Sequence, residues 1–122
     1  MILGIGVDII EVARVRAALE NPRTGTRFRE RVFTPAEAAY CGRRRNAYES
    51  FAARFAAKEA MMKALGRPYG WREIEVERGS GPPTIRLHGR ASARAQELSI
   101  RRILLSLSHT AELAIAYVVT GD

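Results

Sequence analysis

The sequence contains little cysteine and no long hydrophobic run. Cys41 is its only cysteine, so an intrachain disulfide is excluded, and a reducing cytoplasm is the simplest setting to expect. No apolar run approaches the roughly 20 residues that a membrane helix needs, and the N-terminus has no basic leader resembling a signal peptide. We therefore expect neither a membrane segment nor a membrane partner.

Several catalytic motifs are also missing. The chain has no GxxxxGK[ST] loop, no HExxH pair and no GxSxG turn. Gly4-Ile5-Gly6 lies inside an apolar segment and does not open a helix, so it is not a dinucleotide-binding fingerprint. The chain also lacks a set of cysteine and histidine residues that could bind zinc. These absences exclude the commonest nucleotide-binding, metalloprotease and serine-hydrolase sites.

Positive charge is the most marked feature of what remains. The formal net charge is +7, which favours an anionic partner: nucleic acid, an anionic membrane, an acidic protein or a phosphate-rich small molecule. The basic residues are almost all arginine, and the two lysines, Lys58 and Lys63, lie in one short segment. Arginine enrichment can also reflect a GC-rich genome, so charge alone does not decide the function.

The length and pattern predict one domain over residues 1–122 with a packed core, since 47% of the residues are hydrophobic. A capping box at Thr34–Glu37 starts a helix, and Gly66 ends the most regular one. We expect strands at residues 2–10, 73–78, 84–88, 103–108 and 113–120, helices at 11–20, 34–42, 47–65 and 91–98, and a short amphipathic piece around Phe28. This order indicates an α+β fold, a mostly antiparallel sheet packed with a long central helix.

Asp8 lies on an unusual face of the first predicted strand. Alternation places it with Gly4 and Gly6, so a ligand or another backbone can approach this carboxylate closely. The opposite face, with Leu3, Ile5, Val7 and Ile9, is expected to point to a core. The alternative is that Asp8 merely caps the helix that begins near Glu11.

The long helix carries a second carboxylate. Glu59 lies at the margin of an apolar face, where burial is costly unless a cation pairs with it. Lys63 follows at i+4, and an exposed pair of this kind contributes only about 0.2–0.5 kcal/mol. An ordinary Glu59–Lys63 salt bridge is therefore the alternative to a functional carboxylate.

Basic residues gather on and before the same helix. Arg54 and Lys58 share a neighbouring strip, and Arg43–Arg45 form a basic turn before it. Guanidinium forks match phosphate oxygens, so a phosphate clamp is one interpretation. A solvated helix face is the other.

A third polar group ends the fourth predicted strand. In Ser108-His109-Thr110, a histidine lies between two hydroxyls at a strand terminus, where it can contact an anion or transfer a proton. The alternative is a hairpin whose polar side chains satisfy their own backbone.

Three segments together resemble one family. GIGVDIIEVARV (4–15), FAARFAAKEAMMKALG (51–66) and LSLSHTAELAIAYVV (105–119) are similar, in this order, to the signatures of holo-acyl-carrier-protein synthases, the small bacterial 4′-phosphopantetheinyl transferases. The resemblance implies transfer of the phosphopantetheine arm of coenzyme A to a serine of acyl carrier protein, with release of adenosine 3′,5′-bisphosphate, in fatty-acid or polyketide synthesis.

The resemblance also implies residue roles. Asp8 and Glu59 would hold Mg²⁺, which suits two carboxylates supplemented by phosphate oxygens and water, and Lys63 would stabilise the phosphate oxygens. The proton acceptor would be a metal-bound water or Glu59 acting through water. The coenzyme A contacts would be Arg44, Arg45, Arg54, Lys63, Pro83, Ser108, His109 and Thr110.

Two kinds of protein partner follow from the resemblance. Arg14, Phe28 and Arg31 match the surface on which the acidic carrier protein docks, with arginine meeting carboxylates and Phe28 acting as an anchor. The family forms homotrimers with active sites at subunit interfaces, and we expect the same here.

The basic composition leaves a nucleic-acid-binding module as the chief alternative. It lacks interleaved aromatic residues, and it gives no reason for Asp8 and Glu59, which would repel phosphates without a metal. A relative that keeps the fold without turnover is the second alternative, although the acidic and basic signature positions are all present. We expect no nucleic-acid partner.

Overall fold

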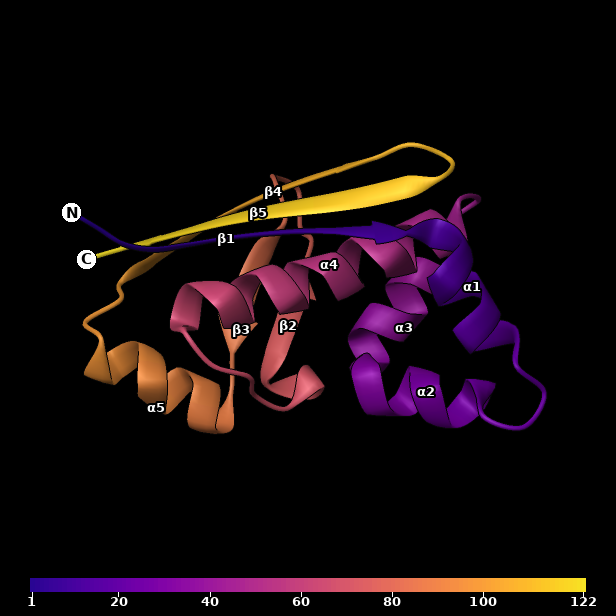
Figure 1. The fold of residues 1–122 in the computed structure, drawn as a ribbon, viewed down its shortest axis with the longest axis horizontal. Helices are drawn as coiled ribbons and strands as arrows, with labels where there is room; N and C mark the ends of the chain where they lie inside the picture. The colour runs from indigo at the N-terminus through magenta and orange to yellow at the C-terminus, as the bar shows by residue number, and fades with distance from the viewer.

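A long central helix, α4 (Ala47–Leu65), carries a three-stranded antiparallel sheet on one side (Figure 1). The structure, a computed structural model, describes all residues 1–122. The sheet order is β1-β5-β4, and a separate antiparallel hairpin is made by β2 and β3. The strands are β1 (Ile2–Glu11), β2 (Ile74–Glu77), β3 (Thr84–Leu87), β4 (Arg102–His109) and β5 (Leu113–Gly121). The other helices are α1 (Val12–Glu20), α2 (Gly25–Val32), α3 (Pro35–Gly42) and α5 (Gly89–Glu97), and a 3-10 turn spans Trp71–Glu73.

The bounds of α4 follow from its composition. Its sequence is rich in alanine and has neither glycine nor proline, so it propagates without interruption. Gly66 ends it in the left-handed conformation, with φ of 88°, and its amide donates to the carbonyls of Met62 and Lys63. Lys63 in the last turn complements the negative end of the helix dipole.

Two glycines let β1 lie directly against α4. A Cβ atom on Gly4 would stand 2.5 Å from the carbonyl oxygen of Ala64, and one on Gly6 would collide with the carbonyl of Ala60. The strand and the helix therefore approach to backbone contact, which leaves no room for a ligand there. This contact aligns the strand with the C-terminal half of α4 and fixes where Asp8 lies.

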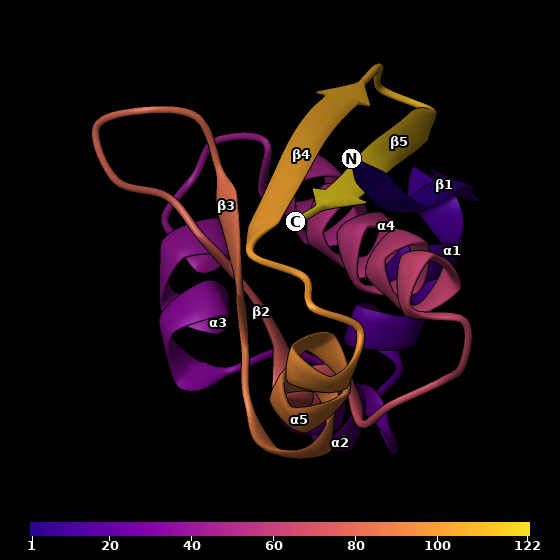
Figure 2. The same ribbon diagram turned by 90° about the vertical axis from the view of Figure 1, so that its left-hand side faces the viewer.

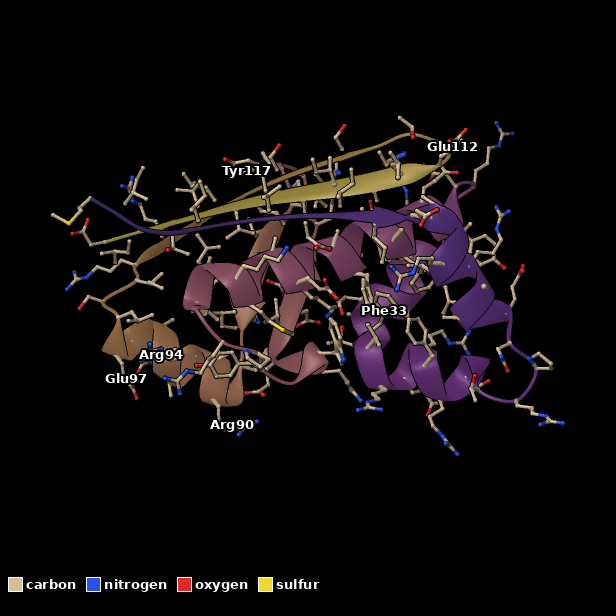
Figure 3. All side chains as sticks on the ribbon, in the orientation of Figure 1. Phe33, Arg90, Arg94, Glu97, Glu112 and Tyr117 are labelled. Carbon is tan, nitrogen blue, oxygen red and sulfur yellow. The ribbon has the colours of Figure 1, made fainter.

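The other face of the sheet is not covered. The prediction that Leu3, Ile5, Val7 and Ile9 point to a core was therefore wrong. Apolar side chains from all three strands of this sheet are exposed on it: Leu3, Ile5, Val7, Ile9, Leu104, Leu113, Ile115 and Tyr117. Figure 3 labels Tyr117 on this open face. We call this set the open sheet face.

The other side of α4 packs on α3 and the β2-β3 hairpin around a buried ion pair. Lys58 and Glu37 have fully buried side chains with 2.8 Å between Nζ and Oε1. Lys58 also donates to the carbonyls of Trp71 and Ile74, while Glu37 accepts from the amides of Thr34 and Val76. Burial lowers the pKa of Lys58, and the Glu37 carboxylate opposes that shift. The network is satisfied on both sides, so it joins α3, α4 and β2.

The predicted α+β class and its element order are confirmed. The capping box is present, because the Thr34 hydroxyl accepts from the Glu37 amide and Glu37 accepts from the Thr34 amide. The piece around Phe28 is a full helix, α2. The strands form two sheets instead of one. No helix of the chain is both long enough and apolar enough to cross a membrane.

Replacing Gly6 with alanine tests the strand–helix contact. Because the new methyl collides with backbone, which cannot rotate away, we expect Gly6→Ala to lower the free energy of unfolding by about 1–3 kcal/mol or more. Urea unfolding followed by circular dichroism measures this. Gly79→Ala is the matched control, since nothing lies within 4 Å of its Cβ position, and it should change stability by less than about 0.5 kcal/mol. Equal midpoints for the two variants would contradict the contact.

Candidate active site

A carboxylate pair forms where β1 meets α4. Asp8 lies inside β1, paired with Ala116 of β5, and Glu59 lies on the face of α4 that the strand covers. The cap hypothesis for Asp8 is wrong, because the residue flanking α1 is Glu11 and no side chain caps that helix. Backbone contact at Gly6 and Ala60 therefore brings two acids, 51 positions apart in the chain, side by side.

Asp8 perturbs the titration of Glu59. Burial raises the pKa of Glu59, and the negative charge of Asp8 together with a hydrogen bond shared with it raises that pKa further. The charges of Lys63 and Arg14 act in the opposite direction. A cation bound beside Asp8 would reduce the repulsion that raises the pKa of Glu59.

The pair fits a hard divalent cation. Its ligand atoms are carboxylate oxygens, which Mg²⁺ prefers, and Mg²⁺ is commonly held by one or two carboxylates with phosphate oxygens and waters completing the octahedron. No group of three or more His, Cys, Asp or Glu side chains gathers at one point. The protein would thus supply two ligands, and the remaining positions would be filled by a bound phosphate and water.

Lys63 pairs with Asp8 and makes no ion pair with Glu59. Its Nζ lies 3.2 Å from Oδ1 of Asp8 and 2.9 Å from the carbonyl oxygen of Val7. The alternative interpretation, a Glu59–Lys63 salt bridge on the surface of α4, is therefore wrong, because Lys63 pairs across to β1. The side chain is 56% exposed, so its ammonium stays accessible to a phosphate group.

A groove opens beside the pair. It has a volume of about 540 Å³ and runs from the carboxylate along the C-terminal turns of α4 to the following loop. Its lining is Glu59, Met62, Lys63, Gly66, Arg67, Pro68 and Trp71. Trp71 stacks on Phe55 with 4.9 Å between ring centres. If a phosphate bound at Lys63, a flexible chain attached to it could pack against the apolar side of this groove.

Arg54 and the basic turn form a second cluster. The Arg54 side chain is 5% exposed, lies 4.4 Å above the ring of Tyr40 and donates to the Ser50 hydroxyl. Arg44 donates to the Tyr40 hydroxyl at 2.9 Å. The cavity beside Arg54 measures about 270 Å³ and is also lined by Arg43. Arg45 is exposed and makes no ion pair.

The clamp hypothesis was wrong for Lys58, whose ammonium is fully buried against Glu37. Arg54 is the residue of that strip that faces a cavity. Its Nε is buried and has no hydrogen-bond partner, which is rare for a buried polar group.

The third predicted group lies at the β4-β5 hairpin. Nδ1 of His109 is 3.8 Å from a carboxylate oxygen of Glu49 in the first turn of α4. The Thr110 hydroxyl accepts from the amides of Glu112 and Leu113, so Thr110 stabilises the turn as the alternative interpretation predicted. Ser108 is exposed.

Pro83 lies in the loop between β2 and β3. This loop stands out from the body of the protein (Figure 2). Glu77 and Arg78, which precede the loop, line the cavity of Arg54. The loop therefore projects from the rim of that cavity and is free to reach beyond its own chain.

A single chain does not bring all these residues together. Arg54 and Glu59 are five positions apart on a helix, so their side chains diverge by about 140°. Glu49, the neighbour of His109, is ten positions from Glu59, about 15 Å along the axis. The carboxylate pair with its groove, and the Arg54 and His109 groups, are two half-sites on different sides of α4.

Of the residues expected to bind a protein partner, Arg14 is the one that lies near the carboxylate pair. Arg14 is exposed on α1 and close enough for its charge to lower the pKa of Glu59. Arg31 is exposed on α2. Phe28 is half-buried between Phe33 and Phe55, with ring centres 6.2 Å apart in each case, so it presents only part of its ring.

Sequence patterns did not reveal Trp71, Arg67 or Tyr40. Trp71 and Arg67 follow the helix terminator Gly66 in a segment with no periodicity, although Trp71 is the only tryptophan in the chain. Tyr40 was hidden in a short helix, and its stacking on Arg54 depends on the packing of α3 against α4.

Comparison with known proteins agrees with these features. Residues 4–118 match the family described as the 4′-phosphopantetheinyl transferase superfamily. A holo-[acyl-carrier-protein] synthase of Anaeromyxobacter sp. (strain K) is 48% identical over 122 residues, covering 98% of this chain and 95% of that protein.

Solved structures agree as well. The crystal structure of holo-[acyl-carrier-protein] synthase from Neisseria meningitidis matches with a TM-score of 0.86 at 30% identity and covers 100% of both chains. The enzyme from Helicobacter pylori, crystallised in complex with coenzyme A, gives a TM-score of 0.82 at 30% identity over 96% of this chain and 99% of that chain. The chain belongs to the 4′-phosphopantetheinyl transferase superfamily. Within that superfamily it is an enzyme of the holo-acyl-carrier-protein synthase family.

Proposed function

We propose that the protein transfers the 4′-phosphopantetheine arm of coenzyme A to a serine of apo-acyl carrier protein, in a Mg²⁺-dependent reaction. The serine oxygen forms a bond to the phosphorus that carries pantetheine, and the bond from that phosphorus to the bridging oxygen of the diphosphate breaks. Adenosine 3′,5′-bisphosphate leaves, and the serine proton passes to Glu59 through a water molecule or to a water that the metal would hold. The observation that carries the proposal is the Asp8–Glu59 pair beside Lys63 at the mouth of an apolar groove.

Each residue of this site has a role in the proposal. Asp8 and Glu59 would hold Mg²⁺, which when bound supplies positive charge to the diphosphate oxygens. Lys63 reaches the same oxygens from its position 3.2 Å from Asp8 and stabilises charge as it moves to the leaving group. The groove lined by Met62 and Trp71 receives the pantetheine chain.

The nucleotide end of coenzyme A fits the second half-site. Arg54, with its free Nε, and Arg44 offer guanidinium groups to the phosphates, and Arg45 is free to swing toward them. His109 and Ser108 are proposed to contact phosphate oxygens, with Thr110 holding the turn that presents them. Pro83 on the projecting loop is proposed to lie against the adenine.

Incubation with apo-carrier protein, coenzyme A and Mg²⁺ tests the reaction. We expect the intact mass of the carrier to rise by one phosphopantetheine, and EDTA to abolish the change. Asp8→Asn and Glu59→Gln, which keep the shapes of the side chains, should lower kcat by at least about 100-fold while the circular dichroism spectrum stays unchanged.

Two results would contradict this proposal. The transfer is refuted if no carrier protein gains mass, and the metal assignment is refuted if either variant keeps near-full activity. Arg86→Gln is a suitable control, because Arg86 pairs only with Glu77 on the surface of the hairpin, and its rate should match that of the wild type.

The carrier protein is proposed to dock beside the groove. Arg14 and Arg31 offer exposed positive charge to an acidic partner, and the aromatic path from Phe28 through Phe55 to Trp71 leads to the groove. A carrier bound there presents its serine near the carboxylate pair, because Arg14 itself lies close to Glu59.

Electrostatic docking predicts a KM for carrier protein that rises with salt, as screening shortens the range of the charges. Arg31→Gln should raise this KM several-fold and leave the KM for coenzyme A unchanged, whereas Arg101→Gln, an exposed arginine between α5 and β4, should change neither. A KM for carrier that is constant up to about 0.5 M salt would remove electrostatic docking from the account.

The protein is further proposed to assemble as a homotrimer through the open sheet face. A contiguous apolar surface of this kind on three adjacent strands marks an interface, and its residues come from strands that also frame the site. Assembly through this face would let the second half-site of one copy meet the carboxylate pair of another. We also expect a reducing cytoplasm, in keeping with the free thiol of Cys41, whose pKa burial raises.

Light scattering coupled to size exclusion tests the assembly. The wild type should run at three times the mass of one chain, and Ile115→Glu on the open sheet face should dissociate it. Ala39→Glu, on the exposed side of α3, is the control and should leave the mass unchanged. Mixing the inactive variants Asp8→Asn and Arg54→Gln should restore part of the activity. A monomeric wild type, or no restoration, would overturn shared sites.

A further inference from the structure

A basic pocket on α5 adjoins the groove beside Glu59 and shares Arg67 and Pro68 with it. It has a volume of about 290 Å³ and lies between the outer face of α5 and the loop that follows α4. Figure 3 shows Arg90, Arg94 and Glu97 along α5, at the opposite end of the molecule from α1 (Figure 1). The lining residues are Arg67, Pro68, Tyr69, Arg90, Ala93, Arg94 and Glu97. We call this cavity the α5 pocket.

The spacing of the α5 residues concentrates positive charge on the pocket. Positions 90, 93, 94 and 97 share one helix face, opposite the buried Ala91 and Ala95. Arg90 and Arg94 are thus like charges one turn apart, and Arg67 adds a third from the loop. Like charges at this spacing disfavour an isolated helix, so an anion placed among them would stabilise the arrangement.

The three guanidinium groups are only weakly engaged by the protein. Arg94 lies 3.4 Å from Glu97 and Arg90 lies 3.8 Å from Glu73, distances at or beyond the limit of a good hydrogen bond. Arg67 takes part in none of the ion pairs of the chain.

Glu73 does not neutralise the arginines of the pocket, because its carboxylate already accepts hydrogen bonds from backbone amides. One carboxylate oxygen accepts from the amides of Arg90 and Ala91, and the other accepts from the amide of Gly70. Glu97, whose side chain is 67% exposed, is the only acid among the residues that line the pocket.

A buried donor in Arg94 has no acceptor. Its Nε is out of contact with solvent and without a hydrogen-bond partner, which is rare for a buried polar group. The Arg94 side chain as a whole is 27% exposed, so an anion in the pocket would meet the exposed part of the guanidinium, and Nε would take part only after the side chain shifts. Arg54 is the only other arginine with such an Nε, and it too lines a cavity in which a phosphate is proposed to bind.

We propose that Arg67, Arg90 and Arg94 form an oxyanion-binding site that takes a phosphate or carboxylate group in the α5 pocket. Guanidinium forks bind both groups through paired N–H donors. Arg67 and Pro68 line this pocket and also the groove beside Glu59. The oxyanion therefore has two possible sources: a free anion, or the acidic end of a molecule that occupies the groove.

Inorganic phosphate tests the first source without carrier, coenzyme A or metal, so the result stays readable even if the proposed transfer fails. In ¹H–¹⁵N spectra of the whole chain with EDTA, phosphate should shift the Arg94 Nε–H signal in a saturable way. Arg67→Gln and Arg90→Gln should weaken this binding about tenfold each. Arg23→Gln, an exposed arginine between α1 and α2, should leave it unchanged.

The second source rests on the proposed function and is tested by kinetics. Arg94→Gln should raise the KM for a coenzyme A thioester of a dicarboxylic acid about tenfold and leave the KM for the acetyl thioester unchanged. Either a saturable shift that depends on the arginines or this selective rise in KM supports the site. If the phosphate-induced shift of the Arg94 signal does not saturate, or is the same in the variants as in the wild type, the phosphate is an adventitious ion only. If, in addition, Arg94→Gln has no selective effect on the KM for the dicarboxylic thioester, the proposal is overturned. Thermal melts confirm that each variant is folded.

Discussion

The backbone contact between β1 and α4 controls the geometry of everything that follows. Because Gly4 and Gly6 lack side chains, the strand lies directly on the carbonyl oxygens of Ala60 and Ala64. That approach brings Asp8 to Glu59 and lets Lys63 reach back to the strand. Burial and then the negative charge of Asp8 raise the pKa of Glu59, because both make a second charged carboxylate at this place unfavourable. The packing of a strand on a helix thus holds two carboxylates together that would otherwise move apart.

The sequence predicted correctly those features of the fold that depend on interactions between residues close together in the chain. The bounds of α4, the Thr34–Glu37 capping box and the stop at Gly66 all depend on residues within a few positions of one another, and the structure confirms them. Which face of β1 is covered could not be predicted, because both faces carry apolar residues, Ile5 on one and Ile10 on the other. Alternation shows that the strand has two faces but does not show which of them is buried. The family resemblance identified Asp8 and Glu59 as a pair, which neither residue's own surroundings in the sequence could do.

The lysine and arginine side chains differ in which groups pair with them, and the sequence does not show these partners. Lys58 is neutralised by Glu37, which lies 21 positions away and meets it only when α3 packs on α4. Lys63, on the same helix, keeps an exposed ammonium. Arg54 and Arg94 are each left with a buried Nε lacking an acceptor. Burial and pairing therefore separate structural cations from those available to anions, and both depend on contacts between distant segments.

The stacked position of Trp71 gives the protein a built-in optical signal. This residue is its sole tryptophan, lies against Phe55 and forms a wall of the groove. Indole emission shifts in wavelength with the polarity around the ring, so a chain that enters the groove and displaces water changes the emission of the only indole in the molecule. Entry of a molecule into the groove beside Glu59 is thereby reported by light from the unmodified polypeptide, without a dye or a label.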